Sequence, residues 1–272
     1  MIKSPLRYPG GKSRAAARIA ALAPDFKAYR EPFVGGGSVF VHLKQLFPDK
    51  TYWINDIYTE LYQFWRVCQQ NVQQVADQVN AWRNQHPEGK ELHRFLNEHL
   101  ANFDELETAA AFFIFNRITF SGTTEAGGYS EQAFKGRFTE SSIQRLFPFA
   151  KLLENVTITN EDYQLILETP GEQVFIFLDP PYYSATKSAL YGKNGKLHKV
   201  FDHERFASAL KNTPHRWLIT YDDSDYIREL FDFAHITAWD LTYGMRNVTA
   251  GSNQVGKELF ISNYPLSEVK KI

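Results

Sequence analysis

Residues 174–183 read VFIFLDPPYY: five apolar residues are followed by an acidic residue, two prolines and two tyrosines. A short apolar run that ends at prolines is typical of a strand buried on both faces, as in a parallel sheet. Other strands are expected at residues 156–159, 217–221, 236–243 and 259–263, and helices near residues 202–212 and 224–231. Alternation of this kind predicts a mostly parallel α/β sheet in the second half of the chain.

The first half of the chain combines two strands with a long helical block. Strands are expected near residues 29–31 and at 51–55, and a short helix at 12–23. A helical pattern covers residues 57–120, a loop or hairpin rich in Gly and Ser covers 121–139, and a further helix is expected at 141–153. Because the helical block interrupts the sheet after two strands, we expect residues 1–56 and 151–272 to form one domain and 57–150 an inserted, mainly helical subdomain.

Composition describes a globular chain and excludes several classes of protein. The 272 residues contain 43% hydrophobic residues, which excludes global disorder. The longest apolar run, at 109–115, is far shorter than the roughly 20 residues needed to span a bilayer, so we expect no membrane partner and a cytoplasmic protein. The single cysteine, Cys68, cannot form an internal disulfide or a thiolate zinc site, and the histidines lack ligand-like spacing, so no metal is expected.

Charge is unevenly distributed, although Lys+Arg (30) and Asp+Glu (31) nearly balance. Basic residues dominate three segments, at residues 1–30, 135–151 and 187–216. Charge alone favours solvated surfaces over a nucleic-acid partner, so a motif is needed beside it.

A glycine-rich loop follows the first expected strand. The segment EPFVGGGSVF (31–40) supplies Gly35 and Gly37, which allow close approach of the backbone to a ligand, but Phe40 occupies the third position of the pattern GxGxxG. Asp56 ends the second strand about 20 residues later, the spacing expected for an acidic residue that binds a ribose hydroxyl. A helix N-cap is an alternative role for Asp56. The segment GGKS (10–13) is not a P-loop, because Leu6 stands where that motif needs glycine.

The DPPYY segment carries groups suited to holding an aromatic amine. The lone pair of such an amine is delocalised, so the amine must be held by hydrogen-bond acceptors alone. Asp179 offers a carboxylate, and Pro180 offers a carbonyl without a competing backbone N–H. Tyr182 would stack on a base taken out of its helix, with Tyr183 supporting the pocket or the strand. The alternative is a Pro-rich turn with core tyrosines.

Taken together, these segments resemble the Dam-type, alpha-class family of adenine-N6 DNA methyltransferases. PLRYPGGK (5–12) is similar to the N-terminal cofactor motif of the family, EPFVGGGSVF to its glycine motif, ND (55–56) to its acidic motif and DPPYY to its catalytic motif. The resemblance implies a Rossmann-like, S-adenosylmethionine-dependent methyltransferase sheet, with residues 57–150 as the target-recognition subdomain. It also implies methyl transfer to the adenine amine of flipped bases in double-stranded DNA.

The resemblance also implies roles for individual residues. Asp179, Pro180 and Tyr182 would be catalytic, with Asp179 placed where the amine meets the methyl donor. Residues expected to bind S-adenosylmethionine are Tyr8, Lys12, Phe33, Gly35, Gly37, Asp56, Asp162 and Asp179. Within this set, Lys12 would pair with the methionine carboxylate of the cofactor, Asp56 would bind its ribose, and Asp162 would approach its adenine ring.

The DNA contacts and the target sequence are less defined. FNRITFSG (115–122) is similar to the start of the DNA-contacting region, so Asn116 and Arg117 are candidate contacts, with capping or pairing inside the insert as the alternative. Lys135 and Arg137 are further candidates, and Gln132 and Glu125 could read bases. Residues 123–138 lack the Asn-Val-Pro string of members that read GATC, so that target is not assigned, and the role of the loop at 244–257 is open.

Other functions remain open at this point. The same chemistry could act on a cytosine amine, an RNA base or a protein glutamine, or the chain could be a DNA-binding module without transfer activity. A cognate restriction nuclease acting separately is a further conceivable partner. A monomer or weak dimer would suffice, since a monomer can methylate each strand in separate encounters.

Overall fold

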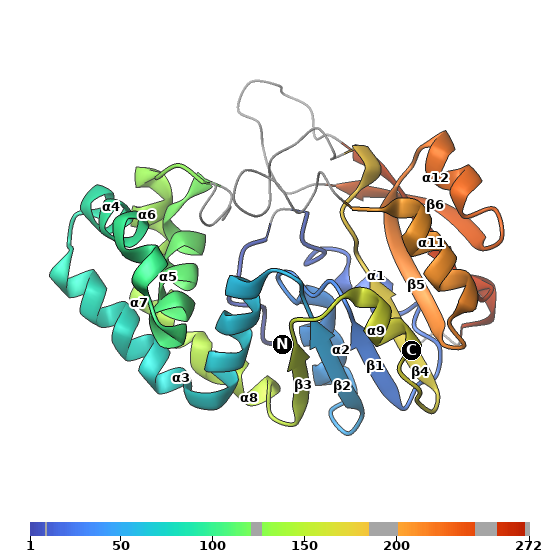
Figure 1. The fold of residues 1–272 in the computed structure, drawn as a ribbon, viewed down its shortest axis with the longest axis horizontal. Helices are drawn as coiled ribbons and strands as arrows, with labels where there is room; N and C mark the ends of the chain where they lie inside the picture. Colours follow the sequence, from blue (N-terminus) through green and yellow to red (C-terminus); the bar gives the residue numbers. More distant parts are fainter. Residues whose placement is uncertain (9, 121–126, 185–200, 243–254, 270–272) are drawn as a thin grey trace.

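The structure, a computed structural model, describes residues 1–8, 10–120, 127–184, 201–242 and 255–269. Within these residues, seven strands form one sheet in the order β3-β2-β1-β4-β5-β7-β6 (Figure 1). The strands are β1 (Ala28–Glu31), β2 (Thr51–Asn55), β3 (Val156–Thr159), β4 (Val174–Leu178), β5 (Arg216–Asp222), β6 (His235–Thr242) and β7 (Val255–Ser262). Strands β1 to β5 pair in parallel, whereas β7 is antiparallel to both β5 and β6. The predicted mostly parallel α/β sheet is confirmed.

Strand β4 is buried on both faces because its side chains alternate between two hydrophobic clusters. Phe175 and Phe177 join the cluster that contains α1 (Ala16–Ala20) and α2 (Ser38–Leu46). Ile176 and Leu178 join the other, which is formed with α9 (Tyr163–Glu168), α11 (His203–Asn212) and α12 (Asp225–Leu230). The alternation follows from the two-residue period of a strand, and it explains why all five positions are apolar. The sheet therefore lies between two layers of helices.

A group of helices between β2 and β3 lies at one side of the sheet in Figure 1. Its members are α3 (Thr59–Gln85), α4 (Gly89–His99), the 3₁₀ turn η1 (Leu100–Asn102), α5 (Glu105–Ile118), α6 (Glu131–Arg137), α7 (Glu140–Gln144) and α8 (Leu146–Leu152). Trp65 of α3 joins this group to the sheet layer: its ring contacts Phe40 of α2 and Phe149 of α8, at centroid distances of 6.4 and 4.9 Å. One core therefore runs through both parts, and the expected boundaries at 56/57 and 150/151 stay predictions.

Three expected elements differ from those observed. The helix predicted at 12–23 is limited to α1, because residues 12–15 form turns in which Ala15 N–H donates to the Lys12 carbonyl. The helix predicted at 141–153 is divided into α7 and α8, since Pro148 cannot donate the hydrogen bond that would continue α7.

The region predicted as a loop or hairpin at 121–139 is also different. Residues 131–137 form α6, whose first turn is capped by the Ser130 hydroxyl accepting from Ala133 N–H at 3.2 Å. An antiparallel bridge between Thr119 and Tyr129 is the part of the predicted hairpin that the described residues contain. Residues 121–126 lie outside the described part, as do 244–254 of the loop at 244–257, while 255–257 begin β7.

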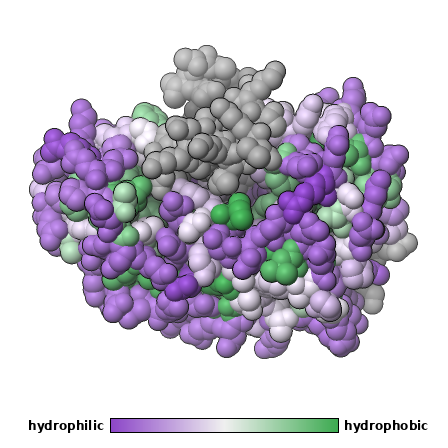
Figure 2. Space-filling model, viewed as in Figure 1, coloured by the Kyte–Doolittle hydropathy of each residue, from purple (hydrophilic) through white to green (hydrophobic). Residues whose placement is uncertain are grey.

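Most of the described apolar side chains are buried in the two clusters. Figure 2 shows the matching surface on the face viewed, which is mainly hydrophilic with separate hydrophobic patches. In the described residues, no helix is both long and apolar enough to cross a bilayer.

Candidate active site

The polar residues that end the parallel strands meet at one edge of the sheet. Glu31 ends β1, Asn55 ends β2, Asp179 follows β4 and Asp222 ends β5. Strands β2 and β3 are added on one side of β1, and the later strands β4 and β5 are added on its other side, so the direction of strand order reverses between β1 and β4. Ligands of open α/β sheets bind at such a switch.

Asp179 is held by two neighbours. Lys12 Nζ donates to Asp179 Oδ1 at 2.8 Å and to Oδ2 at 2.9 Å, and Thr220 Oγ1 of β5 donates to Oδ1 at 2.8 Å. Oδ1 therefore accepts two hydrogen bonds and Oδ2 accepts one. Because each carboxylate oxygen can accept about two, Oδ2 retains an acceptor position for an incoming donor.

Lys12 is surrounded by acceptors of the protein itself. Its ammonium, on a residue that is 4% exposed, also donates to the Gly10 carbonyl at 3.0 Å, so its three hydrogens have protein acceptors. The same ammonium lies 4.9 Å from the centre of the Tyr182 ring. The structure thus brings Lys12, Asp179 and Tyr182 together, and the pairing of Lys12 with a cofactor carboxylate stays a prediction.

The turn after Pro180 is attached to the end of β5. The carboxylate of Asp222 accepts from Tyr183 N–H at 2.9 Å and from Ser184 N–H at 3.0 Å. The Tyr183 ring stacks on Tyr226 of α12, with centroids 4.4 Å apart, and so attaches the turn to that helix. Sequence reasoning missed Thr220 and Asp222, although polar residues at the end of a buried strand were the signal that identified Asp56 and Asp179.

The glycine-rich loop is closely packed between aromatic rings. Gly35 and Gly37 have φ angles of +46° and +64°, which residues other than glycine rarely adopt. A Cβ at Gly35 would lie 2.9 Å from the Tyr8 ring, and one at Gly37 would lie 2.6 Å from the Trp65 ring. Tyr8 and the two glycines, all predicted site residues, are therefore adjacent.

Asp56 fastens the glycine loop to the end of β2. Its Oδ2 accepts from Gly35 N–H at 2.9 Å, and its Oδ1 accepts from Tyr58 N–H at 3.1 Å. Burial raises the pKa of the Asp56 carboxyl to about 6, and the two N–H donors partly oppose this by favouring the ionised form. Since α3 begins at Thr59 with Tyr58 as its N-cap, Asp56 is not the helix N-cap.

Two further buried polar residues complete this edge. Asn55 donates to the Pro32 and Glu161 carbonyls at 3.0 and 2.9 Å and so ties the loop after β1 to the loop after β3. Glu31, which sequence reasoning missed, accepts a 2.6 Å hydrogen bond from the Tyr29 hydroxyl. Burial, together with repulsion from the carboxylates of Asp179 and Asp56, raises the pKa of Glu31 to about 8.

Phe33 and Asp162 lie on the α9 side of the sheet. The Phe33 ring packs against Tyr163 and Phe206, with centroid distances of 5.6 and 5.8 Å. Asp162 caps α9 by accepting from Gln164 N–H, and it forms an exposed ion pair with Arg205 at 2.9 Å. For Asp162 to bind the adenine of the cofactor, as predicted, its ion pair with Arg205 would have to break, or its carboxylate would have to accept hydrogen bonds from Arg205 and the adenine together.

The four candidate DNA contacts differ in accessibility. Asn116 is fully buried, and its side-chain amide accepts from Arg7 N–H and donates to the Arg7 carbonyl, a contact to the N-terminal segment and not within the insert, so its role in DNA binding stays a prediction. Lys135 is exposed and forms an ion pair with Glu131 four residues earlier. Arg117 and Arg137 lie at the ends of α5 and α6 and are not in the ion pairs of the described residues.

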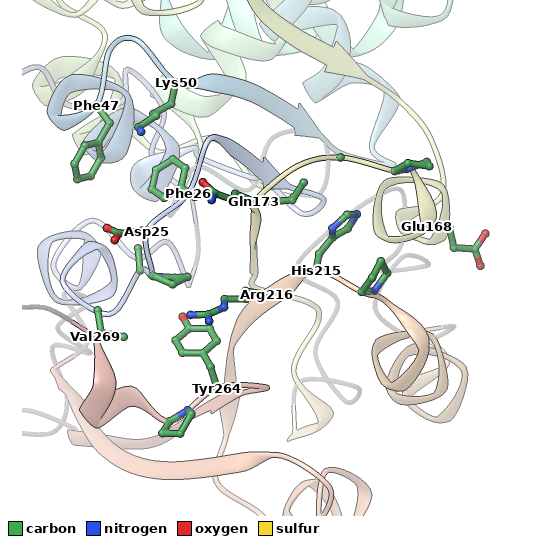
Figure 3. Close-up of a pocket in the computed structure, with 17 residues that line it drawn as sticks. Asp25, Phe26, Phe47, Lys50, Glu168, Gln173, His215, Arg216, Tyr264 and Val269 are labelled. Atoms are coloured by element: carbon green, nitrogen blue, oxygen red, sulfur yellow. The ribbon is translucent and has the colours of Figure 1, made fainter.

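A cavity of about 1060 Å³ opens at the opposite edge of the sheet, beside the first residues of β4 and β5 (Figure 3). Phe26, Phe47, Arg216 and Tyr264 are among its lining side chains. It contains none of the predicted site residues, so it is separate from the edge described above. In the described part of the chain, no group of three or more His, Cys, Asp or Glu side chains is arranged to hold a metal.

Comparisons with known proteins agree with this arrangement of motifs. The family described as D12 class N6 adenine-specific DNA methyltransferase matches residues 8–245. The Type II methyltransferase M.CviBI of Paramecium bursaria Chlorella virus NC1A is 26% identical, over 97% of this chain and 100% of its own length. The Type II methyltransferase M.MjaIII of Methanocaldococcus jannaschii is 27% identical (70% and 72%), and the DNA adenine methylase of Vibrio cholerae is 23% identical (96% and 96%). A match across nearly all of the chain, with the motif residues gathered at one edge of the sheet, means that the chain belongs to the D12 class of N6 adenine-specific DNA methyltransferases.

Proposed function

We propose that this enzyme binds S-adenosylmethionine along the ends of β1 and β2 and methylates a flipped adenine held at Asp179, Pro180 and Tyr182. The observation that supports the proposal most directly is the state of Asp179, whose carboxylate is fixed by Lys12 and Thr220 while Oδ2 retains an acceptor position. An ionised carboxylate can accept a hydrogen bond from an amine and has no donor of its own that would compete for the amine lone pair.

The residues at this edge fit the cofactor that the family uses. Tyr8 and the glycine loop offer an aromatic ring beside accessible backbone, and Asp56 presents a carboxylate oriented by two N–H groups. Phe33 and Asp162 extend the site toward α9, where a nucleoside base would find aromatic surface. When bound, S-adenosylmethionine supplies an electrophilic methyl group.

The chain itself contributes orientation. Asp179 Oδ2 and the Pro180 carbonyl accept the two hydrogens of the adenine amine, which directs its nitrogen toward the donor site. Tyr182, held under the Lys12 ammonium, stacks on the flipped base. Holding the reactants in one geometry lowers the barrier without a separate general base, and the amine loses its proton after attack.

Double-stranded DNA would lie across the basic segments, with the enzyme acting as a monomer or weak dimer. A cytoplasmic location and a restriction nuclease that acts separately belong to the same proposal. Arg137 is the candidate contact best placed to bind DNA, since it is half-buried, whereas Asn116 and Arg117 are buried and Lys135 is paired with Glu131.

The proposal is tested by expressing the chain in a methylation-deficient host and sequencing native DNA by a method that detects methyladenine. Asp179→Asn keeps the shape of the side chain but replaces one carboxylate oxygen by an amide N–H donor, so methylation should be lost. Asp232→Asn, at an exposed position outside the site, is the matched control and should methylate like the parent. Unmodified DNA from a folded, cofactor-binding parent chain would refute the proposal.

A further inference from the structure

Strand β5 extends three residues beyond its neighbour β4. The pairing of the two strands ends at Leu178 and Ile219, and residues 220–222 continue β5 through antiparallel pairing with β7. We call these three residues the β5 overhang. Because β7 holds their backbone, their side chains are carried by a regular strand, which positions groups more precisely than a loop does. The DPPYY segment, which follows the end of β4, lies against them.

Two residues of the overhang contact the groups that would bind the base. Thr220 donates to the Asp179 carboxylate at 2.8 Å, and the centre of the Tyr221 ring lies 5.9 Å from that of the Tyr182 ring. Tyr221 is itself fully buried, among the side chains that cover the α11 face of the sheet. The acceptor for the amine and the ring expected to stack on the base are therefore both in contact with neighbouring residues of one strand.

Asp222, the last residue of the overhang, holds the backbone of the same segment. Its two carboxylate oxygens accept from Tyr183 N–H and Ser184 N–H, one hydrogen bond each. Hydrogen bonds to an ionised carboxylate are about twice as strong as neutral ones. The Tyr183 ring is held separately, since it stacks on Tyr226 and meets the His203 ring edge-on at a centroid distance of 5.6 Å. Loss of the carboxylate would therefore loosen the turn without releasing it from the sheet.

The next residue, Asp223, is a second carboxylate with a different partner. It binds the guanidinium of Arg228 in α12, at 2.6 and 2.9 Å. Asp222 forms no ion pair in the part of the chain that the structure describes, and its hydrogen bonds go to the turn. Two adjacent acidic residues thus separate an attachment of the catalytic segment from an attachment of a helix.

We propose that Asp222 is a positioning residue for methyl transfer: by fixing the backbone directly after Tyr182, it sets where that ring stacks on the flipped adenine. The assignment rests on the proposed function and deepens it, because Tyr182 is the residue expected to receive the base. Asp222 acts through the turn and contacts neither base nor cofactor. A displacement of about 1 Å in a reacting geometry can slow a reaction about 100-fold, so the loss of two backbone hydrogen bonds is enough to affect the rate.

The test is a double-mutant cycle between Asp222 and Tyr182, measured by single-turnover methyl transfer from isotope-labelled cofactor. Asp222→Ala removes both acceptors and should lower kcat about 10- to 100-fold, and Asp222→Asn, which keeps one, should cause a smaller loss. In a Tyr182→Ala background, Asp222→Ala should lower kcat by less than about threefold, because the ring that it positions is already absent. The cofactor dissociation constant should stay unchanged.

Asp223→Asn is the matched control, since it removes a carboxylate one residue away and leaves the turn attached. It should methylate like the parent. If Asp222→Ala does not fold, Asp222→Asn, which keeps the shape of the side chain, takes its place in the cycle.

Three results would overturn the assignment. They are a kcat of Asp222→Ala within about twofold of the control, a cofactor affinity that falls together with kcat, and an equal loss in the parent and in the Tyr182→Ala background, which would indicate a general structural role. In each case a parent chain that methylates DNA leaves the proposed function standing. A parent chain that modifies no adenine refutes the proposed function, and this assignment with it.

Discussion

Replacing Thr220 by valine tests whether the second contact to Asp179 matters for catalysis. Valine has nearly the same shape and suits β5, so the change removes one hydrogen bond and creates no large cavity. A hydrogen bond to a charged group contributes about 1.5–3 kcal/mol. Since the Asp179 side chain is 21% exposed and water can replace part of the contact, we expect the lower end of this range, a fall in kcat of about 10- to 30-fold. Because Lys12 still neutralises Asp179, the free energy of unfolding should fall by no more than about 1.5 kcal/mol.

The assay is single-turnover methyl transfer to duplex DNA from isotope-labelled cofactor, accompanied by thermal unfolding and cofactor binding. Thr220→Ser retains the hydroxyl and should restore most of the rate. Thr157→Val, at an exposed position of β3, controls for the general effect of valine on a strand. The cofactor dissociation constant should be unchanged in all three variants. A Thr220→Val enzyme with kcat within twofold of the parent, or a serine variant as slow as the valine variant, would refute the role of this hydroxyl.

Three further predictions concern the same edge of the sheet. Gly37→Ala should lower the free energy of unfolding by about 2–5 kcal/mol, because φ is positive and the new Cβ meets the Trp65 ring. Gly136→Ala, at an exposed position of α6, is the control and should be neutral or stabilising by about 0.5–1 kcal/mol. Thermal denaturation measures both changes. Cofactor affinity, measured by calorimetry, should weaken as the pH falls below about 6, where Asp56 becomes protonated, and Asp56→Asn should bind weakly at every pH. Glu31 has a pKa of about 8 in the folded protein and an ordinary value of 4.5 when unfolded. Between these pH values it is protonated in the folded state and ionised in the unfolded state, so the protein loses stability as the pH rises through this range. Glu31→Gln should flatten that part of the plot of melting temperature against pH.

The elements that sequence could predict were those with strong local patterns. The run VFIFL was recognisable as a central strand because both of its faces are covered, and the polar residues after strands marked the edge where the site lies. The structure brings Asp179, Tyr182 and Lys12 together as the motifs suggested.

What sequence could not predict depends on contacts between distant residues. The pairing of Lys12 with Asp179 joins residues 167 positions apart, and Thr220 reaches the same carboxylate from β5. Helix α6 was mistaken for a loop because glycines around it masked a local serine cap. Arg117 was identified as a candidate contact, but its burial among like charges arises only when Arg7 and three helical segments converge.

The contact between Trp65 and Gly37 bears on how target specificity could be exchanged between enzymes. The indole of α3 occupies the space directly behind the glycine loop, and its other edges contact α2 and α8. A chimera that replaced the whole helical insert would remove this side chain and leave a gap behind the loop. Grafts that begin after α3 and end before α8 would retain this support, so these are the junctions at which recognition modules should be transplanted.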